Sequence, residues 1–144
     1  MRLLAYEETG RLAECLEALA AHHNEVSVHF RGAYPKRPYE DTLASFREDV
    51  RGGRSRIAVI EEGKILGFCK IDIDGADGKL DYLVVLKEAR GKGYGGLLLG
   101  WALDAFRDSG VSRIELRVVD GNDAAGFYEK YGFRINSHVM RLDL

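Results

Sequence analysis

VVLKEARGKGYGG, residues 84–96, joins a run of apolar residues to a helical pattern through closely spaced glycines. The run that leads into it, residues 79–85, predicts a strand. After it, residues 94–108 carry apolar side chains at helical spacing on two sides, which predicts a helix buried against a sheet. A strand, a glycine loop and a helix start in this order are suited to binding a phosphate group.

The chain before this stretch predicts two helices and two further strands. Apolar residues first recur at helical spacing, a loop with both prolines of the chain follows at residues 32–38, and a second helical pattern ends at a glycine pair. The period then changes to that of strands joined by tight turns, so three consecutive strands predict an antiparallel meander. The expected helices cover residues 10–22 and 39–51, and the expected strands cover residues 56–60, 64–73 and 79–85.

The chain after the glycine loop predicts one parallel crossover. A turn leads from the helix at 94–108 to a strand at 112–119, and strand, helix and strand in this order imply a right-handed connection and a parallel pair. A short helix at 123–131 and a closing strand or hairpin at 133–144 are expected last. The fold class is therefore α/β: a mixed central sheet, made of an antiparallel meander plus one parallel βαβ crossover, flanked by helices.

Length and composition limit the possible classes of protein. A chain of 144 residues forms one domain by size, so we expect a single domain over residues 1–144. The 21 basic and 23 acidic residues give a net charge of −2, which argues against a nucleic-acid or anionic-membrane partner. No apolar run approaches the roughly 20 residues that span a bilayer, and the N-terminus turns acidic before a signal-peptide core could form. We expect a cytoplasmic protein.

The two cysteines and the histidines favour no metal site. Cys15 and Cys69 each lie within an apolar pattern and lack a C-x-x-C spacing, and the four histidines show no ligand spacing either. We expect both cysteines to be small buried side chains with free thiols in a reduced protein.

One glycine pattern in the loop suggests a dinucleotide site. Gly91, Gly93 and Gly96 satisfy G-x-G-x-x-G, and Asp120 at the end of the next strand resembles the carboxylate that binds a ribose in such folds. Against this, residues 86–90 separate the strand from the first glycine, and too few residues follow Asp120 for further parallel strands. The antiparallel meander upstream is also unusual for that fold. The dinucleotide interpretation is therefore the less favoured one.

A second pattern in the same loop leads to a family. Arg90, Gly93 and Gly95 form R-x-x-G-x-G, which resembles the cofactor loop of the GNAT superfamily of acyl-CoA-dependent N-acetyltransferases. Glycines let the backbone approach a pyrophosphate, amides at the helix start point toward it, and Arg90 and Lys92 add positive charge.

A distant segment strengthens this resemblance. NDAAGFYEKYGF, residues 122–133, resembles the other cofactor segment of the family, in which an Asn precedes an F/L-Y-E-K-x-G-F run. The two motifs stand in the family's order, separated by one helix and one strand. The chain is identified on this basis as a member of the superfamily, and a GNAT-like acyl-CoA N-acyltransferase fold is expected.

The resemblance implies an enzyme that transfers an acetyl group from acetyl-CoA, as co-substrate, directly to a primary amine of a small molecule or peptide. The strands around 83–85 and 115–119 would splay apart and admit the pantetheine arm, with a backbone amide near Val85 polarising the thioester carbonyl. The cofactor-binding residues implied are Leu83, Val84, Val85, Arg90, Gly91, Lys92, Gly93, Tyr94, Gly95, Gly96, Asn122 and Tyr128. For Asn122, a helix-capping role is equally open and compatible.

The incoming amine must lose a proton. An alkyl amine with a pKa near 10 is mostly protonated at pH 7, and freeing its lone pair costs about 4 kcal/mol. A nearby carboxylate lowers that barrier as general base. Asp81 is the favoured base, because strand periodicity would place it on one face with Leu83 and Val85, and Asp72 and Asp74 are the alternatives. Asp81 as an ordinary solvated strand residue is the competing interpretation.

The leaving thiolate must gain a proton. Tyr128 is the general acid that the family position implies, and a core aromatic with a bonded hydroxyl is the alternative reading of it.

The remaining properties stay open at the level of sequence. The acids near the expected site favour a cationic amine, residues 29–39 are a candidate mobile lid, and a homodimer is compatible with a family in which dimers are frequent. A CoA-binding sensor or regulatory module without transferase activity is the alternative function.

Overall fold

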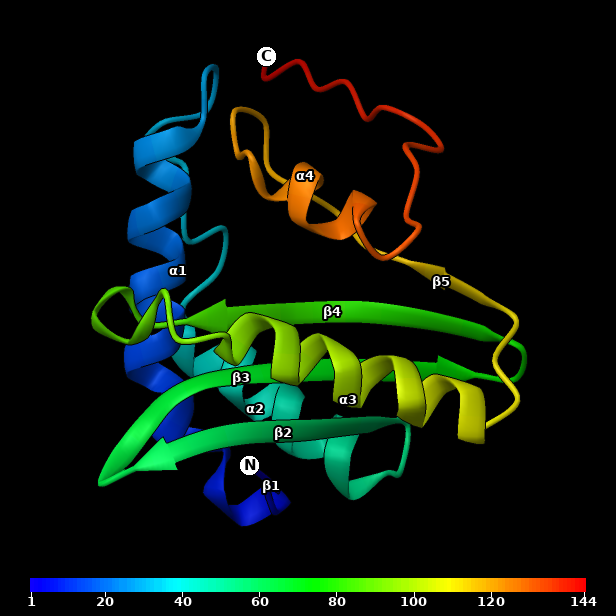
Figure 1. Ribbon diagram of the computed structural model, residues 1–144. Helices are drawn as coiled ribbons and strands as arrows, with labels where there is room; N and C mark the ends of the chain where they lie inside the picture. Colours follow the sequence, from blue (N-terminus) through cyan, green and yellow to red (C-terminus); the bar gives the residue numbers. More distant parts are fainter.

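A five-stranded sheet with helices on both faces forms the structure, a computed structural model that describes residues 1–144 (Figure 1). The strands are β1 (Arg2–Leu3), β2 (Ser55–Glu62), β3 (Lys64–Asp74), β4 (Asp77–Val85) and β5 (Arg113–Glu115). The α-helices are α1 (Ala13–Val26), α2 (Tyr39–Arg51), α3 (Tyr94–Asp108) and α4 (Ala124–Glu129), and η1 (Tyr6–Leu12) and η2 (Lys87–Ala89) are 3-10 helices.

The order of the strands in the sheet is β1-β2-β3-β4-β5. Strands β1 to β4 pair antiparallel, and β5, reached through α3, pairs parallel to β4. The predicted mixed sheet, a meander continued by one crossover, is therefore confirmed. Helices α2 and α3 have the predicted bounds, whereas the first helical region is longer than predicted and begins as η1.

The two faces of the sheet carry different helices. Phe68 of β3 faces α2, and its ring centroid lies 6.1 Å from that of Phe46. On the other face α3 lies across the sheet, and a Cβ atom at Gly78 of β4 would come within 2.6 Å of the Phe106 ring (Figure 1). A glycine is thus needed at residue 78 for α3 to pack this closely.

The hydrophobic core lies between the sheet and these helices, in one cluster of 23 buried residues. Leu98 and Leu99 are adjacent in sequence and both fully buried, because α3 is covered on more than one side. The broad apolar surface of residues 94–108 had predicted this. None of the helices is long and apolar enough to cross a membrane.

Two sequence-based expectations for the C-terminal half were wrong. The strand expected at 112–119 pairs only over Arg113–Glu115, and the closing strand or hairpin expected at 133–144 is not formed. Apolar side chains in this last segment, such as Val139 and Met140, are exposed. Alternating apolar residues can predict a strand, but a strand also needs a partner, and residues 133–144 have none in the sheet.

Candidate active site

The glycine loop predicted to bind phosphate forms a tight connection from β4 to α3. Gly91 and Gly93 have φ angles of 80° and 82°, which residues with a side chain rarely adopt, and Gly93 immediately precedes α3. The first backbone amides of a helix have no partner within it, so those at the start of α3 are free to bind an anion. The loop therefore has the backbone that a pyrophosphate site requires.

Positive charge lies beside this loop. The side chains of Arg90 and Lys92 are exposed, and the Nε atom of Arg90 donates to the Val85 carbonyl oxygen at a distance of 3.3 Å. Ala89, next to Arg90, is buried and anchors the loop on the core. A phosphate at the start of α3 would thus meet two cationic side chains as well as backbone donors.

Helix α4 lies against the first turn of α3, which brings the two predicted cofactor motifs together. A Cβ atom at Gly95 would lie 3.8 Å from the Phe127 ring, and one at Gly96 would lie 3.3 Å from the Tyr131 hydroxyl oxygen. The glycines of the first motif thus allow the aromatic residues of the second to come this close. The sequence indicated each motif separately, and the structure places them side by side.

Tyr128 lies on α4 among aromatic rings and next to the sheet. Its ring centroid is 5.3 Å from that of Phe127 and 5.8 Å from that of Phe133. Burial, with a smaller contribution from Cys69 of β3, raises the pKa of Tyr128 to about 12. The hydroxyl is therefore protonated at neutral pH and can donate a hydrogen bond to a developing anion.

Asn122 stabilises the turn that leads into α4. Its Oδ1 atom accepts a hydrogen bond from the backbone amide of Ala124, the first residue of α4, at 3.0 Å. The N-cap position itself is occupied by Asp123, so Asn122 is not the N-cap residue that the sequence had suggested.

Strands β4 and β5 separate soon after they meet. Their pairing covers only Asp77–Lys79 on β4 and Arg113–Glu115 on β5. Residues 83–85 of β4 have a partner on the β3 side and none on the other. The splayed strands expected near Leu83, Val84 and Val85 are present, and one edge of β4 is open to a ligand that can bond with a strand.

A β-bulge places Asp81 differently from the prediction. Tyr82 pairs with Lys70 and Leu80 pairs with Ile71, so Asp81 is an extra residue in β4. Its carboxylate lies on the α2 face with Lys70, whereas Leu83 is opposite Cys69 on the other face. The expected shared face with Leu83 and Val85 was therefore wrong, because the bulge interrupts the alternation of the strand.

Asp81 belongs to a charged cluster around a buried lysine. The Nζ atom of Lys70, with a side chain only 1% exposed, lies 2.6 Å from an oxygen of Asp72, 2.8 Å from one of Asp81 and 3.5 Å from one of Asp49. Burial alone would lower the pKa of Lys70, but the hydrogen bonds to Asp72 and Asp81 outweigh it and raise the pKa. Asp81 also lies 3.2 Å from Lys79.

The three candidate bases thus differ in surroundings. Asp81 and Asp72 already accept hydrogen bonds from Lys70, and Ser55 donates a further one to Asp72 at 2.5 Å. Asp74 is exposed at the turn between β3 and β4. The carboxylate of Asp81 thus already contacts two ammonium groups, those of Lys70 and Lys79.

Asp120 does not have the free carboxylate that a ribose-binding residue would need. Its oxygen atoms accept hydrogen bonds from Ser27, Val28 and His29, which follow α1. The side chain of Asn24 holds the backbone of the same connection at Gly32 and Tyr34. Sequence reasoning missed Asn24 and Ser27, and only the Asp-Gly pair at 120–121 signalled a turn there.

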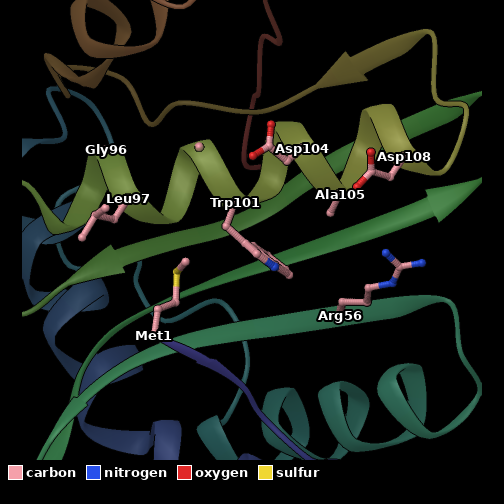
Figure 2. Close-up of a pocket in the computed structure, with 9 residues that line it drawn as sticks. Met1, Arg56, Gly96, Leu97, Trp101, Asp104, Ala105 and Asp108 are labelled. Carbon is pink, nitrogen blue, oxygen red and sulfur yellow. The ribbon is translucent and has the colours of Figure 1, made fainter.

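A groove of about 550 Å³ lies elsewhere, between α3 and β2 (Figure 2). Met1, Arg56 and Trp101 line it, and Gly96 is the only predicted cofactor residue among its walls. Figure 2 shows the groove on the β2 side of α3, whereas Tyr128 lies on α4. The groove is therefore separate from the site that the two motifs form.

Comparison with known proteins identifies the family. The model of the acetyltransferase (GNAT) family matches residues 6–133. A Bacillus subtilis protein that carries an acetyltransferase name is 29% identical over 106 residues, which are 74% of this chain and 70% of that protein. The [ribosomal protein bS18]-alanine N-acetyltransferase of Haemophilus influenzae is 35% identical over 79 residues, and the match spans 54% of this chain and only about half, 53%, of that protein.

A solved structure shows the same fold. The PaiA N-acetyltransferase of Thermoplasma acidophilum, in complex with coenzyme A, superposes with a TM-score of 0.74 at 20% identity, over 96% of this chain and 91% of that one. The matched family model and the shared fold place the chain among the acetyltransferases. This chain belongs to the GNAT acetyltransferase family, as its motifs had predicted.

Proposed function

We propose that the protein transfers an acetyl group from acetyl-CoA directly to a primary amine of a small molecule or peptide. The observation that carries this proposal is the contact of α4 with the first turn of α3, where Phe127 and Tyr131 approach Gly95 and Gly96. That contact brings the glycine loop together with the segment that carries the protonated Tyr128, which lies near Cys69, the β3 residue that pairs with Leu83 of β4.

Acetyl-CoA would be held at two places. Its pyrophosphate would bind the amides at the start of α3, with Arg90 and Lys92 beside it. Its pantetheine amides would bond with the open edge of β4 at residues 83–85, as a neighbouring strand would. The relative of known structure that is named as a coenzyme A complex supports this choice of donor.

The transfer moves one acetyl group and takes two protons from the amine. The ammonium loses one proton to a base or to water, and the free amine nitrogen then attacks the thioester carbonyl carbon. The C–N bond forms, the nitrogen loses its second proton, the C–S bond breaks, and coenzyme A leaves as a thiolate that takes up one proton. The pKa of Tyr128, about 12, lies above the pKa of a thiol, about 8.5, so Tyr128 acts chiefly by donating a hydrogen bond to the sulfur as negative charge develops.

The surroundings of Asp81 lead to a preference among acceptors. If Asp81 is the base, directly or through water, the amine of the substrate must share the carboxylate oxygens of Asp81 with Lys70 and Lys79, which already contact them. Deprotonating an alkyl amine at pH 7 costs about 4 kcal/mol, whereas a peptide α-amine with a pKa near 8 costs only about 1 kcal/mol. We therefore favour acceptors with a weakly basic amine, such as a peptide N-terminus. The name of the Haemophilus relative, which specifies an alanine of a ribosomal protein, is consistent with this preference.

The test is the release of free thiol from acetyl-CoA in the presence of an amine panel. The panel pairs peptides with a free N-terminal alanine against the same peptides with a blocked N-terminus and a lysine side chain, together with polyamines. Turnover with free N-termini is the expected result. Coenzyme A binding without turnover on any amine would instead favour a sensor or regulatory module.

A further inference from the structure

Asp120 joins two parts of the molecule that are distant in sequence. It lies between β5 and α4, and its carboxylate accepts hydrogen bonds from the Ser27 hydroxyl at 2.7 Å and from the amides of Val28 and His29 at 2.8 and 3.0 Å. These bonds, that from His29 foremost, hold the pKa of Asp120 below its usual range. The carboxylate is therefore ionised at neutral pH and bonded to the turn that follows α1.

Ser27 is well suited to make this contact rigid. It is 0% exposed, and while its hydroxyl donates to Asp120, its Oγ atom accepts from the backbone amide of Phe30 at 2.9 Å. The carbonyl oxygen of Ser27 accepts a further bond from Arg31 at 2.8 Å. One buried side chain thus orients residues 27–31 relative to Asp120.

Gly121 brings the two backbones into direct contact. Its φ angle is 77°, and a Cβ atom there would lie only 2.1 Å from the carbonyl oxygen of Val26, the last residue of α1. A side chain at residue 121 would push α1 away. Asp120 and Gly121 together with Ser27, Val28 and His29 form a unit that we call the Asp120 clamp.

The clamp lies beside the candidate active site. Asp120 and Gly121 immediately precede Asn122, whose side chain accepts a hydrogen bond from the first amide of α4, and α4 carries Tyr128. Figure 1 shows α4 and the upper end of α1 on the same side of β4, the side on which its edge is open beyond Lys79. The two sides of that edge are thus connected by the clamp.

We propose that Asp120 is a positioning residue that fixes the turn at 27–31 to the segment carrying Asn122 and Tyr128. On the proposed function, residues 27–31 form one wall of the amine site, and the clamp keeps this wall in register with Tyr128, the hydrogen-bond donor to the leaving thiolate. The clamp touches neither the glycine loop nor Arg90. Its loss therefore weakens use of the amine and leaves coenzyme A binding intact.

The test compares Asp120→Asn with Asp123→Asn in the full-length protein. Asp123 lies in the same turn, is exposed, and makes no side-chain hydrogen bond, so it is a matched control. The measurements are the KM for the best amine of the panel, kcat, the Kd of coenzyme A by calorimetry, and the rate of tryptic cleavage after Arg31. Ser27→Ala is the second variant, in case Asp120→Asn folds poorly.

We expect Asp120→Asn to raise the amine KM and the rate of cleavage after Arg31 by about tenfold each, as loss of hydrogen bonds to a charged group would. The Kd of coenzyme A should change by less than about twofold, and Asp123→Asn should match the wild type. Ser27→Ala should show the same pattern at smaller size.

Three results would overturn the proposal. Faster cleavage with unchanged amine KM and kcat would leave the clamp a purely structural contact. A KM effect without faster cleavage would mean that Asp120 acts in another way, and equal losses for amine and coenzyme A would mean general damage. If the wild type has no transferase activity, the proposed function fails, and cleavage after Arg31 still reports whether the clamp exists.

Discussion

The glycine loop at 90–96 and the connection at 27–34 after α1 are two parts of the candidate site whose shapes have different causes. The loop takes its shape from its own residues, since Gly91 and Gly93 adopt positive φ angles and Gly93 starts α3. The turn takes its shape from side chains outside it or at its edge, Asn24 and Asp120. A loop whose shape depends on its own residues can be predicted from a short sequence motif. A turn whose shape depends on hydrogen bonds to residues distant in sequence cannot.

The largest effect is expected from a substitution in the glycine loop, measured as the loss of coenzyme A binding. Gly93→Asp introduces a side chain where φ is 82° and a negative charge where a pyrophosphate would bind, so calorimetric titration with coenzyme A should show no measurable binding. Gly100→Asp is the control, since a Cβ there has no neighbour within 4 Å and the residue lies within α3, away from its start. Normal affinity in Gly93→Asp would refute this placement of the phosphate.

The next effect concerns Tyr128, which lies on α4, the helix that follows the clamp. Tyr128→Phe should lower kcat by about 100-fold, the lower end of what loss of one positioned hydrogen-bond donor to a developing anion costs, with nearly unchanged affinity for coenzyme A. Because the pKa of Tyr128 is raised to about 12, its ionisation should not reduce kcat of the wild type below about pH 11.

Tyr131→Phe serves as the control for Tyr128→Phe, since it removes a hydroxyl from a half-exposed ring near the end of α4. Equal kcat values for wild type and Tyr128→Phe would remove this hydroxyl from the mechanism.

The third effect concerns the charged cluster around Lys70, which also joins residues from different parts of the sequence. Lys70→Met leaves Asp72 and Asp81 without their buried partner, so the free energy of unfolding should fall by about 3 kcal/mol. The raised folded-state pKa of Lys70 gives stability that is complete below the unfolded pKa, about 10.4, and is lost as pH rises through the folded value.

Urea unfolding at pH 7 measures the change, and Lys79→Met, which removes an exposed ammonium from the same Asp81, should cost less than about 1 kcal/mol. If the two lysine variants are equally stable, the cluster is not held together as the structure indicates.

The smallest effect is expected when Asp120 is protonated, because this weakens only the hydrogen bonds that hold the turn after α1. The lowered pKa of Asp120 contributes stability above its unfolded pKa, about 3.9, and this contribution is lost as pH falls through the folded value. Hydrogen exchange of the Val28 and His29 amides, corrected for the intrinsic pH dependence of exchange, should therefore lose protection below about pH 4, before the amides of α3 do. Simultaneous loss of protection in both places would contradict a separate clamp.

Much of the fold could be predicted because its signals are local. Helix α2 ends at the glycine pair after Arg51, and α3 begins after Gly93, so periodicity and glycine gave correct bounds for both. The two cofactor motifs are also local, which is why the family could be recognised from residues 90–95 and 122–133.

The errors arose where contacts between distant residues decide the structure. The bulge at Asp81 exists only in the pairing of β4 with β3, and a single-strand pattern cannot show it. The expected strand at 133–144 had a suitable alternation and found no partner in the sheet. Asp120 looked like a ligand-binding acid because the sequence could not show that Ser27, 93 positions away, would donate to it.

The early separation of β4 and β5 links ligand binding to thermal stability. Residues 83–85 present unpaired backbone groups along the open edge of β4. A pantetheine arm would form hydrogen bonds with these groups, as a further strand of the sheet would. By mass action, coenzyme A at about 100 times its Kd would add about 2.7 kcal/mol to the free energy of unfolding. A melting curve with and without coenzyme A would then report donor binding before any acceptor is known, and NAD at the same concentration should leave the curve in place.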